Sequence, residues 1–450
     1  MLTLKRAKAI HGKLTLPPSP DLFCIAAFTA LASGRPVHIH PVGQSAQVRR
    51  WADLLAGHAE MSIDNYRCTI DPAKGNTAAD IILPDETLPY RDLIVFLALG
   101  THKRVLFRSV GEARLLSWQA QATRLGFGME IVQESGMSGL VLKALSSSTP
   151  LPAMVEERDI QPGLGLLFAL KAKRSFRIGF NLSNAFRHLC SLFGQPIEVK
   201  RDIGETEKDP LLRRMRLKAG QRLSSQDQTF LVTADFSTPP ESPSMVDLLL
   251  PGDEVMLALF CAAKSLVQKD SLVIDNVPLE SWASPMLGLL RKMGCKASVQ
   301  ELQRTAFGSS GMISLPKYEV KGQKTDFIAQ HHSAYQLPSM AIAAAFAEGQ
   351  SLFRQFDDLR LNDPDSIRQL EFCLKTMGVK FGDIPDGLVI QGAEEYDGFD
   401  LIEPLPAHLG AAFAVAGLRC VGSTTIYDEH ILERWPDFYE TVMNVCEFRN

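Results

Sequence analysis

One local pattern recurs along the chain and restricts its fold more than any other feature. It is clearest over residues 335–378: an alanine-rich apolar helix begins at Leu337-Pro338 and ends at Gly349, a short strand follows, and an amphipathic helix ends at Gly378. A proline at the start of a helix and a glycine just beyond its end are common helix limits. The pattern predicts a helix–strand–helix unit, followed by one or two further strands.

The same unit occurs six times, with apolar helices that begin near residues 21, 88, 163, 251, 335 and 405. Such repetition indicates a repeat architecture, although the spacings are too long and irregular for a solenoid. Three units in each half therefore predict two pseudo-threefold α/β domains, each with buried helices inside and sheets outside. An ordinary α/β protein with alternating helices and strands is the alternative interpretation.

The chain of 450 residues is too long for one ordinary core, so two domains are expected. Residues 203–247 are first charged and then rich in serine and proline, and the apolar run that follows favours a connection near residues 248–252. Pro17-Pro18 interrupts the first strand region and predicts a second connection. We expect one domain at 17–248 and another formed by 1–16 together with 249–450. Two connections favour closure of the domains over a ligand in the cleft.

The composition excludes several classes of partner. Hydrophobic residues make up 46% of the chain and charged residues 22%, with a net charge of −4. Binding of nucleic acid or an anionic membrane needs clustered positive charge, and neither is expected here. No apolar run is long enough to span a bilayer, and the N-terminus lacks the apolar segment of a signal peptide. The sequence predicts a soluble, cytoplasmic protein.

Cysteine and histidine give no sign of a metal site. The eight cysteines lie far apart without a CxxC pair, which predicts reduced and mostly buried thiols. His38 and His40 are spaced for one face of a strand, but no carboxylate or cysteine lies near them in the sequence. We expect neither a metal nor a cofactor.

Several segments share the order and residue pattern of one known family: residues 16–34, 251–267, 276–294, 337–349, 357–379, 386–392, 408–418 and 433–440. Through them the sequence resembles the enolpyruvyl (carboxyvinyl) transferases over nearly its whole length. The resemblance implies two inside-out α/β domains, each a threefold repeat. It also implies closure over phosphoenolpyruvate and a phosphorylated acceptor alcohol.

The resemblance also implies a site with several cations, because the family's reaction handles a carboxylate and two phosphates and moves protons. This sequence departs from the family at most of those positions. The family's first Lys-Ser pair falls on Ser19-Pro20-Asp21, and the Arg after it falls on Cys24. An Asn-x-Gly-Thr loop is replaced by residues 84–87, which include the acidic Asp85 and Glu86. As an ordinary enolpyruvyl transferase, the site is predicted to be disabled.

One of the family's arginines is kept as Arg91, which we predict to bind substrate. The alternative is a structural arginine at a helix start, paired with Asp85 or Glu86. The family's Lys-Glu-x-Asp-Arg motif falls on residues 362–366, so Asp363 is predicted as a catalytic carboxylate and Asp365 as a substrate-binding one. Capping of the following helix is the alternative for both, because carboxylates accept hydrogen bonds from helix N-terminal amides.

Two further polar residues fall on family positions. The family's His-Arg pair falls on Ala407-His408, and His408 is predicted to donate to an anion or to act in proton transfer. The alternative is a satisfied polar residue at the edge of the cleft. Tyr335 replaces the family's general-base aspartate and is predicted to present its phenol to a ligand, with packing as the alternative.

Two functions remain open from the sequence. The first is an enolpyruvyl-transferase-like protein with an altered interdomain site that acts on a different acceptor or ligand. The second is a catalytically degenerate paralogue that binds a metabolite or a protein partner without turnover. In either case we expect a small-molecule ligand in the interdomain cleft, either phosphoenolpyruvate or another anion. Different chemistry on a neutral or cationic ligand would also suit the loss of positive charge.

Overall fold

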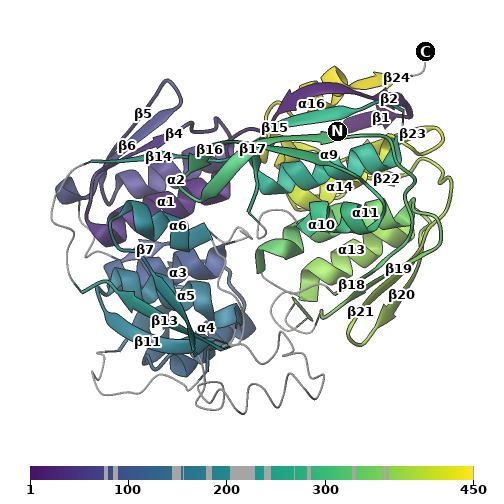
Figure 1. Cartoon of the computed structure of the whole chain (residues 1–450). Coiled ribbons are helices and arrows are strands. Elements are labelled where there is room, and N and C mark those ends of the chain that lie inside the picture. The colour runs from purple at the N-terminus through teal and green to yellow at the C-terminus, as the bar shows by residue number, and fades with distance from the viewer. Residues whose placement is uncertain are drawn as a thin grey trace, which may run out of the picture.

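The computed structural model of the chain has two lobes that lie side by side (Figure 1). It describes residues 1–75, 80–84, 90–143, 154–155, 157–178, 185–202, 229–237, 245–267, 269–280, 285–326, 331–356, 359–360 and 364–448. Both chain termini belong to the second lobe, where strand β2 (Ala7–Ile10) pairs antiparallel with strand β24 (Cys446–Phe448).

In the first lobe, three sheets surround three helices that contact one another: α1 (Pro20–Ser33), α3 (Arg91–Thr101) and α5 (Glu157–Ala169). The strand orders are β14-β4-β6-β5, β7-β8-β10-β9 and β11-β13-β12. These strands are β4 (Val37–His40), β5 (Glu60–Asp64), β6 (Arg67–Asp71), β7 (Ile81–Ile82), β8 (Val105–Phe107), β9 (Met129–Glu134), β10 (Met137–Leu142), β11 (Lys173–Ile178), β12 (Glu198–Asp202), β13 (Thr229–Asp235) and β14 (Val246–Leu249). The other helices are α2 (Ala46–Ala56), α4 (Glu112–Arg124), α6 (Ala185–Leu192) and the short η1 (Pro72–Lys74).

The second lobe repeats this plan around α9 (Glu254–Leu266), α11 (Leu337–Ala345) and α14 (Ala407–Gly417), which also contact one another. Its sheets have the orders β16-β17-β15-β3, β18-β19-β21-β20 and β1-β23-β22. Its strands are β1 (Leu2–Lys5), β3 (Gly12–Thr15), β15 (Leu272–Pro278), β16 (Ser298–Thr305), β17 (Gly308–Leu315), β18 (Lys324–Asp326), β19 (Gln350–Arg354), β20 (Lys380–Ile384), β21 (Gly387–Gln391), β22 (Asp400–Leu401) and β23 (Ser423–Ile426). The other helices are α10 (Pro285–Lys292), α13 (Pro364–Thr376), α15 (Glu429–Arg434), α16 (Phe438–Val445) and the short η4 (His331–Gln336).

The central helices are buried because apolar residues make up most of each of them. In α1, all residues from Pro20 to Ala32 are buried. Small residues also let these helices approach closely. A Cβ built on Gly100 of α3 would lie 2.2 Å from the Cβ of Ala169 in α5, so no larger residue fits without movement.

The chain crosses between the lobes twice, at residues 16–18 and 250–252, which we call the hinge. Strand β3 pairs parallel with β15 of the second lobe, and β14 pairs parallel with β4 of the first. Backbone hydrogen bonds join the two crossings: the amide of Ser19 donates to the carbonyl of Pro251 at 3.1 Å, and the amide of Asp253 donates to the carbonyl of Pro17 at 2.8 Å. The buried apolar residues form two separate clusters, and the chain passes from one cluster to the other at these crossings.

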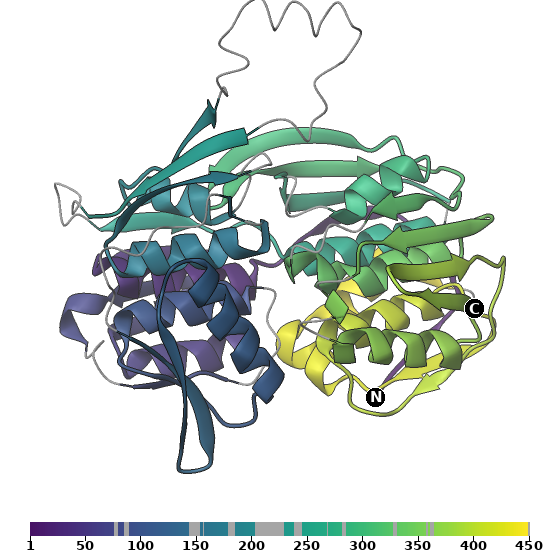
Figure 2. The same ribbon diagram turned by 90° about the horizontal axis from the view of Figure 1, so that it is seen from below.

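A third contact between the lobes comes from the hairpin of β16 and β17, whose strands reach toward the first lobe (Figure 2). At its tip, Ala306 and Phe307 are buried in the core of the first lobe. The amide of Ala306 donates to the carbonyl of Leu249 at 2.8 Å. This hairpin therefore belongs to the second lobe by its strand pairing and to the first lobe by its packing.

The eight cysteines are all free thiols, and seven of them are buried, as predicted. Among the described helices, none combines the length and the apolar character that a membrane span needs. The domain boundaries at residues 17 and 248 stay a prediction.

Candidate functional site

The N-terminal ends of α1 and α9 lie at the boundary between the lobes, and both carry buried carboxylates. Asp253 caps α9, because its Oδ1 accepts hydrogen bonds from two first-turn amides at 2.8 and 3.2 Å. Ser19 caps α1, and Asp21 follows in the first turn. The side chains of Asp21 and Asp253 are both 0% exposed. The amides and dipole at a helix N-terminus attract negative charge, and here carboxylates of the chain itself supply it.

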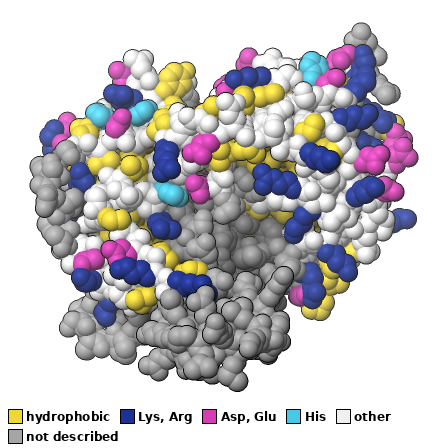
Figure 3. Space-filling view, viewed as in Figure 1, with side chains coloured by type: hydrophobic (Ala, Val, Ile, Leu, Met, Phe, Trp, Pro, Cys, Tyr) yellow, Lys and Arg dark blue, Asp and Glu magenta, His cyan; other side chains and the backbone are white. Residues whose placement is uncertain are grey.

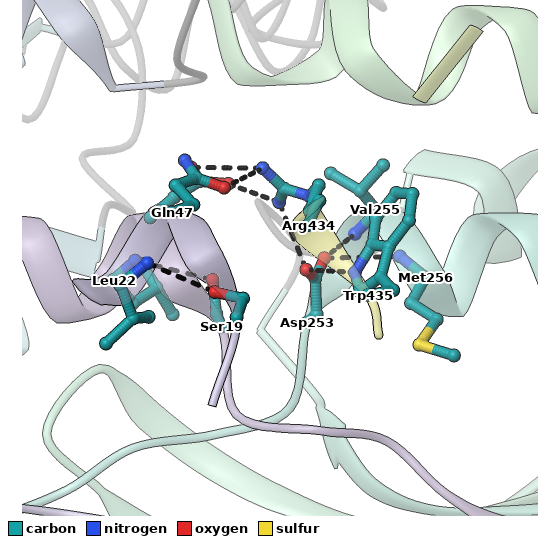
Figure 4. A network of polar contacts seen from close by, with 11 residues as sticks. Ser19, Leu22, Gln47, Asp253, Val255, Met256, Arg434 and Trp435 are labelled. Atoms are coloured by element: carbon teal, nitrogen blue, oxygen red, sulfur yellow. Dashed lines mark hydrogen bonds and ion pairs between the residues drawn. The ribbon is translucent and has the colours of Figure 1, made fainter. Parts of the chain in front are cut away.

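Arg434, the last residue of α15, joins these two carboxylates. Figure 4 shows its guanidinium between Gln47 and Asp253. Its Nη2 lies 2.6 Å from Oδ2 of Asp21 and 3.0 Å from Oδ2 of Asp253. Its Nη1 donates to Oε1 of Gln47 at 3.3 Å, and Nε2 of Gln47 donates to Oδ1 of Asp21 at 3.2 Å. The indole of Trp435 donates to Oδ2 of Asp253 at 2.9 Å. We call these five residues the Arg434 cluster.

The Arg434 cluster connects the lobes beside the hinge. Asp21 and Gln47 belong to α1 and α2 of the first lobe, whereas Asp253, Arg434 and Trp435 belong to the second. The side chain of Arg434 is only 9% exposed. Because a buried guanidinium needs both charge and hydrogen-bond partners, the relative position of the two lobes is fixed by this side chain as well as by the hinge.

Glu254 adds a third buried acid next to Asp253. Burial raises the pKa of Glu254 to about 8, and the negative charges of Asp253 and Asp21 act in the same direction. Burial also raises the pKa of Asp21, although Arg434 opposes this. Burial alone would lower the pKa of Arg434, but Asp21 and Asp253 outweigh it and hold the pKa above its usual value. At neutral pH, Arg434 is therefore charged, Glu254 carries a proton, and the charge of the guanidinium is matched within the protein.

A pocket of about 370 Å³ opens beside the Arg434 cluster, between the lobes. The space-filling view shows this face of the molecule hollowed between the lobes, with charged and apolar side chains interspersed around the hollow (Figure 3). The volume lies in the range of small-molecule sites. We call it the interdomain pocket, and it is lined by Gln47, Arg50, Tyr335, Pro404, Leu405, Pro406, Ala407, His408, His430, Glu433 and Arg434.

The lining of the interdomain pocket carries little unmatched charge. The rings of His408 and Tyr335 lie together, with centroids 4.6 Å apart. Burial, with a smaller contribution from Arg434, lowers the pKa of His408 to about 3, so its imidazole is neutral at physiological pH. Arg50 from α2 lies 3.3 Å from the carboxylate of Glu433 across the lobes. The lining of the pocket therefore offers a ligand mainly hydrogen bonds from uncharged groups.

Two of the predicted residues, Tyr335 and His408, therefore lie together in one pocket. Arg91 does not line it. The Arg91 guanidinium lies 5.4 and 5.5 Å from the ring centroids of Phe107 and Trp118, in the first lobe. The next residue, Asp92, accepts a hydrogen bond from the indole of Trp118 at 2.7 Å. The role of Arg91 in substrate binding stays a prediction.

The two predicted aspartates of the second lobe have different outcomes. Asp365 lies in the first turn of α13, and its carboxylate lies 2.9 Å from the guanidinium of Arg368 on an exposed surface. It does not line the interdomain pocket, and its ligand-binding role is untested. Asp363 lies outside the described residues, as do Asp85 and Glu86.

Sequence reasoning did not predict roles for Arg434, Gln47 and Trp435. It considered Asp21 only as part of a segment in which the family's lysine is missing. One signal was present: Asp21 stands in an otherwise apolar helix, and a buried carboxylate needs a partner. The partner is 413 residues away, and no local pattern links the two. Among the described residues, no group of three histidine, cysteine or acidic side chains is placed to hold a metal ion.

The comparison with known families agrees with this architecture. A family model for EPSP synthase (3-phosphoshikimate 1-carboxyvinyltransferase) matches residues 218–442, half of the chain. The chain belongs to the EPSP synthase family. Its matched half contains most of the second lobe, from α9 into α16, including Asp253, Tyr335, His408 and Arg434.

Relatives in this family are distant. The 3-phosphoshikimate 1-carboxyvinyltransferase of Thermus thermophilus is 29% identical over 202 residues, which cover 44% of this chain and 46% of that protein. The enzyme of the same description from Acaryochloris marina is 28% identical over 200 residues, which cover 44% of this chain and 45% of that protein. The match thus spans just under half the length of these relatives.

Solved structures extend the likeness to the whole chain. The EPSP synthase of Acinetobacter baumannii superposes with a TM-score of 0.68 at 17% identity, covering 98% of this chain and 97% of that one. The enolpyruvyl transferase NikO from Streptomyces tendae gives 0.65 at 13% identity, covering 99% and 98%. The two-domain inside-out α/β fold predicted from the sequence is confirmed.

Proposed function

We propose that this member of the EPSP synthase family is an enolpyruvyl-transferase-like protein that acts on an acceptor or ligand different from shikimate 3-phosphate, in the interdomain pocket. The observation that carries the proposal is the pairing of Arg434 with Asp21 and Asp253. Helix N-termini and a buried arginine would together make a strong anion site. In this chain both are already occupied by carboxylates of the protein.

Charge in the rest of the lining supports the same proposal. A ligand with several phosphate and carboxylate groups needs several cations whose charge is not already matched. Arg50 is paired with Glu433, and His408 is neutral. The amide of Gln47, the phenol of Tyr335 and the imidazole of His408 suit hydroxyl or carbonyl groups. We therefore expect a ligand that is neutral or carries a single negative charge.

The test combines turnover with binding. We expect no phosphate release from phosphoenolpyruvate with shikimate 3-phosphate, and no saturable heat in a calorimetric titration with either compound. A thermal-shift screen of neutral and singly charged hydroxyl compounds should give saturable stabilisation that is lost in His408→Asn and Tyr335→Phe. Tyr439→Phe, at an exposed tyrosine outside the pocket, is the control. Phosphate release that falls in Arg91→Ala would contradict the proposal.

A second candidate function is binding without turnover. The low pKa of His408 favours it, because an imidazole that is neutral at physiological pH cannot deliver a proton as imidazolium. The two functions differ in the fate of the ligand that the screen identifies. NMR after prolonged incubation shows an unaltered ligand for a binding protein and a new product for an enzyme.

A further inference from the structure

A second pocket lies in the second lobe and shares no residue with the interdomain pocket. Its volume is about 700 Å³, and α10, labelled in Figure 1, ends at its edge. Four lysines stand on its wall against one acidic residue. The lining residues are Lys292, Met293, Gly294, Lys296, Pro316, Lys317, Tyr318, Glu319, Lys321 and Gln323. We call this site the lysine pocket.

Backbone hydrogen bonds hold the two sides of the lysine pocket together. One side is the connection from α10 to β16, and the other is the connection from β17 to β18. The amide of Lys321 donates to the carbonyl of Met293 at 3.3 Å. The second side is also tied to Glu348, whose carbonyl accepts from Gly322 and whose amide donates to Val320, both at 2.8 Å. The backbone segments that carry the lysines are therefore held together by hydrogen bonds.

Positive charge in the lysine pocket is largely uncompensated. The ammonium of Lys321 lies 3.8 Å from the carboxylate of Glu319, whose side chain is 88% exposed. Within the described parts of the chain, Lys292, Lys296 and Lys317 form no ion pair. The pocket therefore carries local positive charge, although the whole protein has a net charge of −4.

We infer that the lysine pocket binds a compact polyanion that carries two or more phosphate groups. Lysines on a preformed wall attract phosphates as point charges, and several together raise the local concentration of an anion. The volume fits a small molecule. Four lysines around one pocket of an acidic protein suit a compact anion better than an extended nucleic acid, which needs a long basic surface. The inference does not depend on the function proposed for the interdomain pocket.

The test is calorimetric titration of the full chain with inorganic triphosphate at low ionic strength. Lys292→Glu/Lys317→Glu reverses one charge on each side of the pocket. The matched control is Lys375→Glu/Lys380→Glu, the same charge change at two exposed lysines on α13 and β20. We expect one saturable site in the wild-type chain, and at least about tenfold weaker binding in the pocket variant, since hydrogen bonds to charged groups are lost. The control should bind like the wild type.

Three outcomes would overturn the inference. The first is the absence of saturable triphosphate binding. The second is an equal loss of affinity in both double variants, which would show a general effect of net charge. The third is equal affinity for inorganic monophosphate and triphosphate, which would show an adventitious ion only. Thermal unfolding of each variant confirms that the chain is folded, and the substituted lysines are exposed, so folding should be unaffected.

Discussion

Nη2 of Arg434 and Oδ2 of Asp21 lie 2.6 Å apart, although the two residues are 413 positions apart in the chain and belong to different lobes. Asp21 is fully buried and Arg434 nearly so, and both also contact Gln47. A second carboxylate, Asp253, also accepts a hydrogen bond from Nη2 of the guanidinium. This contact fixes the lobes relative to each other and also removes a cation from the ligand-binding surface.

Removing the guanidinium should therefore destabilise the protein strongly. In Arg434→Met, Asp21 and Asp253 remain buried without a counterion, and we expect a loss of about 3–5 kcal/mol in the free energy of unfolding. Urea unfolding at pH 7 measures it. The neighbouring Arg50→Met is the control, because Arg50 and Glu433 form a partly exposed pair whose loss should cost less than about 1 kcal/mol. Equal effects of the two substitutions would contradict the role assigned to Arg434.

Glu254 should make stability fall as pH rises from about 4.5 to about 8. Its pKa is about 8 in the folded protein against 4.5 for an ordinary glutamate. Between these values the folded state holds a proton that the unfolded state releases, so stability is highest at the acidic end and falls as pH rises. The slope is up to about 1.4 kcal/mol per pH unit, and it ends above the folded pKa. Chemical unfolding of wild type and Glu254→Gln between pH 6.5 and 8 tests this, since the variant should lack the slope.

His408 should contribute a slope of opposite sign at lower pH. Its pKa is about 3 in the folded protein against an ordinary value of 6.5. Between these values the unfolded state binds a proton that the folded state does not, so stability falls as pH falls from 6.5. His102, with a pKa of about 4, acts in the same way. His408→Asn should remove only part of the acid sensitivity between pH 6.5 and 4.5. An unchanged profile would show that His408 is accessible and titrates normally.

The close contact of α3 and α5 gives a prediction about packing. In Gly100→Ala the new methyl group would lie 2.2 Å from the Cβ of Ala169, and such overpacking should cost about 1–3 kcal/mol. Gly288→Ala in α10 is the matched control, because nothing lies within 4 Å of its Cβ position. Alanine is the better helix former, so this control should be stabilised by up to about 1 kcal/mol. Thermal unfolding of both variants distinguishes the two effects.

The fold was predictable because its central helices carry a local signal. The runs that became α9, α11 and α14 are apolar on all sides and are separated by strands and turns that repeat in the same order. Burial of such helices follows from their composition alone. Tyr335 and His408 were each predicted as site residues from the sequence, but their contact with one another was not predicted and is seen only in the structure.

The partners of the charged groups were not predictable in the same way. Periodicity and capping describe contacts within a few residues, whereas Arg434 finds Asp21 only after both lobes have folded. Asp365 was predicted to bind substrate from its place in a family motif, and this role stays a prediction. The structure adds a local contact, because its carboxylate pairs with Arg368 on the surface of α13. Side-chain pairing across the chain needs the three-dimensional structure.

The tip of the β16–β17 hairpin affects how this protein can be dissected. Phe307 fills part of the core of the first lobe, yet it comes from the second half of the chain. A fragment that ends near residue 248 would have an apolar cavity where Phe307 packs. A fragment that begins near residue 249 would expose the side chain of Phe307 to solvent. We expect neither half to fold into a stable, soluble protein by itself. Gene fusion or domain exchange within the family would have to transfer the hairpin together with the lobe that receives it.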